Sequence, residues 1–178
     1  SLPHAILLST GEVLVVGEDA ACEGEGVYGG SKSVYAEVYH PSSNTWTKTG
    51  SLNLPRAYFA SAALTNGRAL VTAGVNGDGV SYSSTKIYDV ATGTFTQSGL
   101  LNYARTSPVY AKLKDGRVLV AGGTYYSSPE SDGKRLSSAE IFDPATATWS
   151  MTGAMHETRD DTAAVTLAQS GSSSRNSW

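Results

Sequence analysis

Short apolar runs separated by turn residues recur along the whole chain, and they predict an all-β protein. In the middle of the chain, for example, we expect four strands at residues 59–64, 69–73, 84–88 and 94–98. Each of these runs is rich in small or β-branched residues and is bounded by Gly, Asn, Asp or Ser. Long helices are not expected.

The same layout occurs three times. A large aromatic residue is followed four residues later by a glycine and six residues after that by an arginine. These landmarks are Trp46, Gly50 and Arg56, then Phe95, Gly99 and Arg105, then Trp149, Gly153 and Arg159. Three copies in register indicate a repeat protein. We expect the large aromatic residues to pack between neighbouring units.

Tight turns join the strands within each unit. The first and second strands meet at Thr10-Gly11, Asn66-Gly67 and Asp115-Gly116. Asn-Gly and Asp-Gly favour the type I′ hairpin turn, which needs positive φ at both central residues. The third and fourth strands meet at residues 41–44, 90–93 and 144–147. Each unit is therefore predicted to be a four-stranded antiparallel sheet.

A four-stranded antiparallel unit that repeats about every 50 residues is the blade of a β-propeller. The chain resembles the Kelch repeat family, including the propeller domain of galactose oxidase-like proteins. The matching residues are Gly122-Gly123, residues 139–144 (Ala-Glu-Ile-Phe-Asp-Pro), Trp149, Gly153 and Arg159. The resemblance implies a Kelch-type β-propeller segment of three four-stranded antiparallel blades plus one extra strand.

The diglycine differs between the units. Gly17-Glu18 and Ala73-Gly74 stand where the third unit has Gly122-Gly123. Because a residue with a Cβ disfavours positive φ, we expect a less regular backbone at the first two positions.

The repeat predicts one Kelch-repeat arc over residues 3–167, with a polar tail at residues 168–178. Its blades span about residues 3–50, 57–99 and 107–153, and residues 163–167 form the extra strand. Propellers have four to eight blades, so three blades leave two apolar faces uncovered. We expect missing blades or self-association: the chain is a piece of a longer propeller, two chains close a six-bladed ring, or the arc stays open with modified ends.

Composition narrows the classes of partner that the chain could bind. Charged residues are only 16% of the chain, the net charge is −3 and the pI is about 5.5, so no basic surface for nucleic acid is expected. The chain contains no run of about 20 apolar residues, so a membrane-spanning helix is not expected. The single cysteine, Cys22, excludes an internal disulfide and a Cys-rich metal site. Richness in Ser, Thr, Gly and Tyr favours a secreted or cell-surface protein.

The longer connections supply the candidate binding residues. Because strands alternate in direction, these connections gather on one face of the arc, where repeat proteins usually carry function. The candidates are Tyr28, Arg56, Tyr58, Tyr82, Arg105, Tyr125, Tyr126 and Arg159. Tyr and Arg on loops suit a protein surface or a glycan. The arginines recur with the blade, so a structural role for them stays open.

Catalytic residues, metals and cofactors are not expected. His4, His40 and His156 are too far apart to form a spaced metal motif. Residues 24–29 match a dinucleotide fingerprint in letters, but no helix follows them. Residues 56–58 (Arg-Ala-Tyr) are similar to the segment that holds the radical tyrosine of copper radical oxidases. The cysteine which that family cross-links to this tyrosine precedes a proline, and here Leu2 precedes Pro3.

The sequence therefore favours a non-catalytic binding module that presents long loops to a protein or glycan ligand. Two alternatives remain open. The chain could belong to a larger propeller enzyme of the copper-oxidase or carbohydrate-active kind, or it could be a structural arc that dimerises to close a ring.

Overall fold

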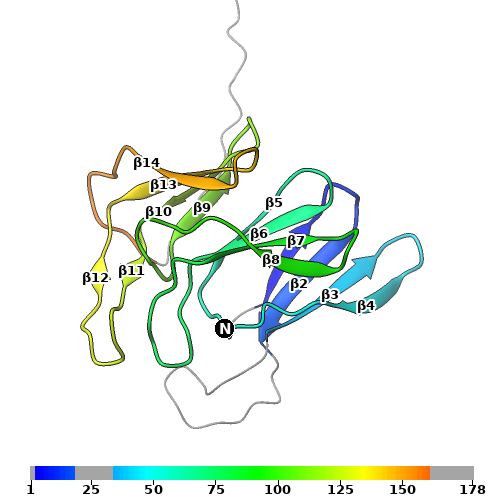
Figure 1. The fold of residues 1–178 in the computed structure, drawn as a ribbon, viewed down its shortest axis with the longest axis horizontal. Helices are drawn as coiled ribbons and strands as arrows, with labels where there is room; N and C mark the ends of the chain where they lie inside the picture. The colour runs from blue at the N-terminus through cyan, green and yellow to red at the C-terminus, as the bar shows by residue number, and fades with distance from the viewer. Residues whose placement is uncertain (1–2, 19–33, 161–178) are drawn as a thin grey trace, which may run out of the picture.

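The protein is all-β, with three four-stranded antiparallel sheets that follow one another along the chain (Figure 1). The structure, a computed structural model, describes residues 3–18 and 34–160. The predicted fold class is thus confirmed. Within these ranges the structure contains no helix that could cross a membrane. The extra strand and tail expected at residues 163–178 lie outside the described residues.

Each sheet is one blade, and its strands pair in chain order. Blade 1 consists of β1 (His4–Leu7), β2 (Val13–Glu18), β3 (Val34–His40) and β4 (Thr45–Thr49). Blade 2 consists of β5 (Ala60–Ala63), β6 (Arg68–Thr72), β7 (Thr85–Asp89) and β8 (Thr94–Gln97). Blade 3 consists of β9 (Val109–Lys112), β10 (Val118–Ala121), β13 (Ala139–Asp143) and β14 (Thr148–Thr152). The short strands β11 (Thr124–Tyr125) and β12 (Lys134–Arg135) form a separate hairpin between β10 and β13.

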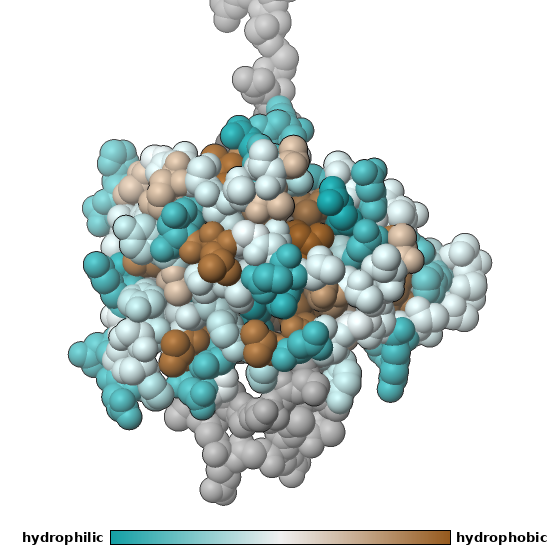
Figure 2. Space-filling model, in the orientation of Figure 1, coloured by the Kyte–Doolittle hydropathy of each residue, from teal (hydrophilic) through white to brown (hydrophobic). Residues whose placement is uncertain are grey.

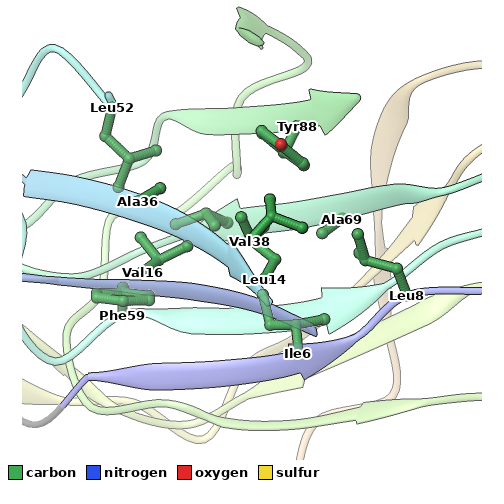
Figure 3. Close-up of a cluster of buried hydrophobic side chains, with 11 residues drawn as sticks. Ile6, Leu8, Leu14, Val16, Ala36, Val38, Leu52, Phe59, Ala69 and Tyr88 are labelled. Atoms are coloured by element: carbon green, nitrogen blue, oxygen red, sulfur yellow. The ribbon is translucent and has the colours of Figure 1, made fainter. Parts of the chain in front are cut away.

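The core consists of two layers of side chains, one between each pair of blades. Between blades 1 and 2, Ile6, Leu14 and Val38 pack against Ala69 and Tyr88 (Figure 3). The second layer lies between blades 2 and 3. We call the face of a blade that packs on the preceding blade its leading face, and the opposite face its trailing face. Alternation along each strand separates the two sets, because successive side chains point to opposite faces.

The second layer repeats the first one blade later. Leu70 and Ala62 on the trailing face of blade 2 contact Val118, Phe142 and Trp149 on the leading face of blade 3. The outer surface is different in character. Figure 2 shows hydrophobic side chains as separate patches among polar ones on the side that it presents. The apolar surface that folding removes from water is therefore concentrated between the blades.

The hairpin turns follow the type I′ prediction at Asn66-Gly67 and depart from it at Asp115-Gly116. Asn66 and Gly67 have φ of 57° and 68°, as a type I′ turn requires. In the equivalent turns only Gly11 and Gly116 have positive φ, so the type I′ prediction is wrong for Asp115-Gly116. Thr10 is β-branched and resists positive φ. Asp115 instead accepts a hydrogen bond from the Arg117 amide at 3.1 Å, a local bond that holds a different turn.

The backbone of the diglycine position in blade 2 is as regular as in blade 3. Ala73 and Gly74 have φ of 60° and 93°, close to the 64° and 85° of Gly122 and Gly123. The expectation of a less regular backbone at Ala73-Gly74 is therefore wrong. Gly74 donates a backbone hydrogen bond to the Arg105 carbonyl, and Gly123 donates the equivalent bond to Arg159. The Gly74 bond and the hydrogen bond from Arg56 Nη1 to the Ala73 carbonyl hold Ala73 in a conformation that costs about 1 kcal/mol or more for a residue with a Cβ.

Candidate functional site

The connections that follow β4, β6, β8 and β10 lie on one side of the arc, because antiparallel strands alternate in direction. We call this side the loop face. In Figure 1 the connection between β6 and β7 and the β11–β12 hairpin extend from the same side of the sheets. Hydrogen bonds tie the two together: the Ser81 amide donates to the Tyr126 carbonyl at 3.0 Å, and the Tyr126 amide donates to Ser81 Oγ at 2.9 Å.

Two of the predicted binding arginines do not face this surface. Arg105 is buried, and its Nη1 donates to the carbonyls of Gly122 and Ser138 at 2.8 and 3.0 Å. Its Nη2 lies 2.8 Å from Glu140 Oε1, with both side chains fully buried. A guanidinium that uses its donors inside a blade does not present its charge to a ligand. Arg105 therefore fixes the carbonyl groups that surround the end of β10.

Glu140 fixes the connection between blades 2 and 3, and sequence reasoning missed this role. Its Oε2 accepts hydrogen bonds from the Asn102 amide and side chain, and its Oε1 accepts one from the Tyr103 amide at 3.0 Å. One carboxylate thus neutralises Arg105 and holds the loop beside it. The available signal was Glu140 itself, an acidic residue alternating with the apolar residues of a strand.

Arg56 occupies the equivalent position in blade 2 and is also buried. It donates to the Ala73 and Ser84 carbonyls and to Ser84 Oγ, but Lys86 stands where blade 3 has Glu140. Its guanidinium lies instead over the ring of Tyr82, 4.6 Å from the centroid. Burial lowers the pKa of Arg56 to about 10, so the side chain still carries its charge at neutral pH. Arg56 and Tyr82 thus form a cation–π pair inside the blade.

The predicted tyrosines differ in exposure. Tyr58 and Tyr125 are 50% and 39% exposed, whereas Tyr82 and Tyr126 are partly buried. Burial raises the pKa of the Tyr82 phenol, which keeps it neutral above Arg56. Tyr28 lies outside the described residues. Among the candidate tyrosines that the structure describes, Tyr58 and Tyr125 are therefore the two whose side chains are exposed to a ligand.

Exposed side chains of the connections between blades join these two tyrosines on the loop face. Leu54 and Tyr103 occupy the same position in the first two connections and are 43% and 52% exposed. The third connection ends at Arg159, whose side chain is exposed and makes no hydrogen bond or ion pair with any described residue. Arg159 is therefore the one predicted arginine that stands free within the described ranges.

A second group of polar side chains gathers where the first strands of neighbouring blades meet, and the sequence did not reveal it. His4 Nδ1 lies 2.9 Å from Ser61 Oγ and 3.5 Å from the Tyr110 hydroxyl, and its ring stacks on Phe59. Burial lowers the pKa of His4, so its ring is neutral at pH 7. The described residues place no carboxylate beside the ring to orient it as a base. This group packs β1, β5 and β9 together, and only the convergence of three first strands could have pointed to it.

The described part of the chain does not gather metal-ligating side chains into a cluster. Residues 3–18 and 34–160 contain no group of three or more His, Cys, Asp and Glu side chains that could hold an ion. Tyr58, the residue that resembles the radical tyrosine of the copper oxidases, has its carbonyl bonded by the Ser107 amide and its side chain in solvent.

Comparison with known proteins agrees with the architecture. Residues 114–156, which run from the β9–β10 turn through the end of blade 3, match the family model of the Kelch motif. No curated protein matches the chain. The Kelch motif suggests a β-propeller module for protein interaction. Residues 114–156 therefore carry a Kelch motif, and blades 1 and 2 repeat the same four-stranded unit.

Proposed function

We propose that the chain is a non-catalytic interaction module that binds a protein partner through its loop face. The observation that carries this proposal is the set of large side chains that the connections hold in solvent. They are Leu54, Tyr58, Tyr103 and Tyr125. Tyrosine is enriched in protein interfaces because its ring buries a large area while its hydroxyl stays hydrogen-bonded.

The loops that carry these side chains are fixed before any partner binds. The Ser107 amide donates to the Tyr58 carbonyl at 2.9 Å, and this bond joins the segments that lead into β5 and β9. Glu140 holds the Tyr103 amide, and Ser81 holds the β11–β12 hairpin that bears Tyr125. Binding to a prearranged surface loses less conformational entropy than binding that must order its loops. A rigid frame of this kind supports tight recognition by a few side chains.

Selection of peptides tests the proposal without a known partner. A phage-displayed library of random peptides is selected on the immobilised protein, and the affinity of the recovered peptides is measured by calorimetry. We expect the double variant Tyr58→Ala/Tyr125→Ala to weaken these peptides by about 30-fold or more, since truncating a hot-spot residue costs about 2 kcal/mol. Lys114→Ala is the control, because Lys114 is exposed in the β9–β10 turn, on the side of the sheets opposite the loop face.

Peptides that bind the double variant as tightly as the wild type would overturn the assignment of the loop face. A glycan array supplies the other outcome. Saturable binding of one class of glycan that the double variant loses, together with failure to recover any peptide, would replace the protein partner by a carbohydrate. In either case the urea unfolding midpoint of the double variant should match that of the wild type, because both rings stand in solvent.

A further inference from the structure

We propose that the leading face of blade 1 binds the trailing face of blade 3 of a second copy of this chain, so that two arcs close one ring. The inference does not depend on the loop face. It rests on three features that repeat with the blade. The first two are satisfied at both interfaces within the chain and the third at the interface between blades 2 and 3, and all three are unsatisfied at the two ends of the arc.

The first feature is the aromatic residue of the fourth strand. In blade 3, Trp149 is 9% exposed, packs on blade 2 and donates from Nε1 to Thr85 Oγ1 at 2.9 Å. Trp46 has the same register position in blade 1, paired with Tyr39 as Trp149 is paired with Phe142, yet it is 54% exposed. Leu7 on the same face is 66% exposed. The prediction that Trp46 packs between blades is therefore wrong within one chain.

The second feature is the glycine that follows the fourth strand. Gly50 approaches the next blade so closely that its amide donates to the Gly93 carbonyl at 2.8 Å, and a Cβ there would meet this oxygen at 2.6 Å. A Cβ on Gly99 would meet the Ala147 carbonyl of blade 3 at 2.5 Å. Gly153 is the third glycine of this series and has nothing within 4 Å of its own Cβ position. The trailing side of blade 3 is thus shaped for a close neighbour.

The apolar residues of this trailing face agree with the glycine. Leu119 in β10 corresponds by strand register to Leu14 in blade 1 and to Leu70 in blade 2. Both of those leucines are fully buried against the next blade, whereas Leu119 and its neighbour Ile141 remain partly exposed. Blade 3 therefore presents the same apolar surface that blades 1 and 2 bury.

The third feature is charge, and it identifies the occupant. The Arg105 carbonyl accepts from Gly74 of blade 2, while its guanidinium pairs with Glu140 on the leading face of blade 3. The Arg159 carbonyl accepts the equivalent bond from Gly123, but its guanidinium has no partner among the described residues. Glu37 has the register position of Glu140 in blade 1, opposite Val15 as Glu140 is opposite Val120. Glu37 is exposed and likewise unpaired among the described residues.

A second copy satisfies both ends at once. Arg159 of one chain would meet Glu37 of the other, and Trp46 would pack on the Leu119 face, at two equivalent interfaces. Three blades from each chain make six, which lies within the range of closed propellers. Such a pair has two-fold symmetry, the commonest arrangement of homo-oligomers. It buries a free acidic group and a free basic group together, so neither charge is left uncompensated.

The test is the mass of the chain in solution, measured by light scattering and by sedimentation over a range of concentrations. We expect a two-chain species whose dissociation constant rises about 100-fold in Arg159→Glu and in Glu37→Arg, since a desolvated charge pair is converted into two like charges. An equimolar mixture of these two variants should recover the wild-type constant within about fivefold. In that mixed pair, one interface carries the native charges and the other carries the reversed pair.

Trp46→Ser is an independent variant, and it should weaken the pair by about 30-fold or more. Far-UV circular dichroism of each variant checks that the fold is retained, as expected for exposed positions. A monomer at every concentration would overturn the proposal and point to blades supplied by another partner. Assembly that grows beyond two chains, or a dimer insensitive to all three variants, would also overturn it.

Discussion

The arginine sites of blades 2 and 3 share one backbone frame but balance the buried charge in different ways. In both, Nη1 donates to two main-chain carbonyls, and a serine lies at Nη2. Blade 3 adds the carboxylate of Glu140, whereas blade 2 adds the ring of Tyr82. The frame therefore requires a guanidinium, and the compensation of its charge varies from blade to blade.

Two positions distinguish the sites. Lys86 in blade 2 has the register position that Glu140 has in blade 3. Tyr82 corresponds to Leu136, because the Tyr82 amide donates to the Gly74 carbonyl and the Leu136 amide donates to the Gly123 carbonyl. Where the carboxylate is present an aliphatic residue is sufficient, and where it is absent an aromatic ring covers the charge. Arg56 Nε is left buried without a hydrogen-bond partner among the described residues. The blade 2 site is thus the less well satisfied of the two.

Among substitutions at these two sites, Glu140→Gln is expected to cause the largest loss of stability. This change leaves Arg105 buried without its counter-charge and places amide hydrogens opposite the Asn102 and Tyr103 donors. Breaking a fully buried pair by removing one partner costs about 3 kcal/mol or more. We expect a loss of this size in the free energy of unfolding, measured by urea denaturation.

Glu37→Gln is the matched control for this prediction, because Glu37 has the same register on blade 1 but stands in solvent. Its effect on monomer stability should lie within about 0.5 kcal/mol. A loss in Glu140→Gln no larger than in the control would show that the buried pair adds nothing to stability.

Much of this architecture could be predicted from the sequence, because it depends on spacing. The alternation of apolar residues and the register of Trp46, Phe95 and Trp149 specify four strands per unit and three units. Positions of the strands in blade 2 agree within about one residue at each end, since Gly and Asn turns bound them. Strand and turn positions depend on residues that are neighbours in the sequence, so they can be predicted from it.

The partners of the charged residues could not be predicted in the same way. Arg56 and Arg105 lie on long connections, where exposed arginines bind ligands, and nothing local shows that their side chains turn inward. Their burial depends on carbonyls of Ala73 and Gly122 that are 17 residues away along the chain. Tyr58 is exposed, whereas the ring of Tyr82 covers the charge of Arg56, and this difference likewise depends on tertiary packing.

A smaller loss is expected from Tyr82→Leu, which gives blade 2 the residue that blade 3 has at this place. The change removes the ring above Arg56 and keeps an apolar side chain of similar reach. A cation–π pair is worth about 0.5–1 kcal/mol at an exposed site and about 2 kcal/mol or more when desolvated, and the leucine keeps part of the apolar contact, so we expect the free energy of unfolding to fall by about 1–2 kcal/mol. Urea denaturation measures the loss, and Tyr126→Leu serves as a control on the adjacent hairpin. Equal losses in both variants would contradict a specific role for the ring.

The smallest effect, and the one opposite in sign, is expected from Lys86→Glu. A carboxylate at this position would lie beside Arg56, as Glu140 lies beside Arg105, and would replace a like charge. Part of the Coulombic gain is offset by desolvation of the new carboxylate, so we expect about 1 kcal/mol of added stability in urea denaturation. The gain should be larger in the Tyr82→Leu background, because the guanidinium there has lost its other compensation, and neighbouring substitutions of this kind are not additive. Lys86→Gln separates removal of the lysine charge from formation of the ion pair. If Lys86→Glu is no more stable than Lys86→Gln in either background, the frame of blade 2 does not accept the carboxylate that blade 3 uses.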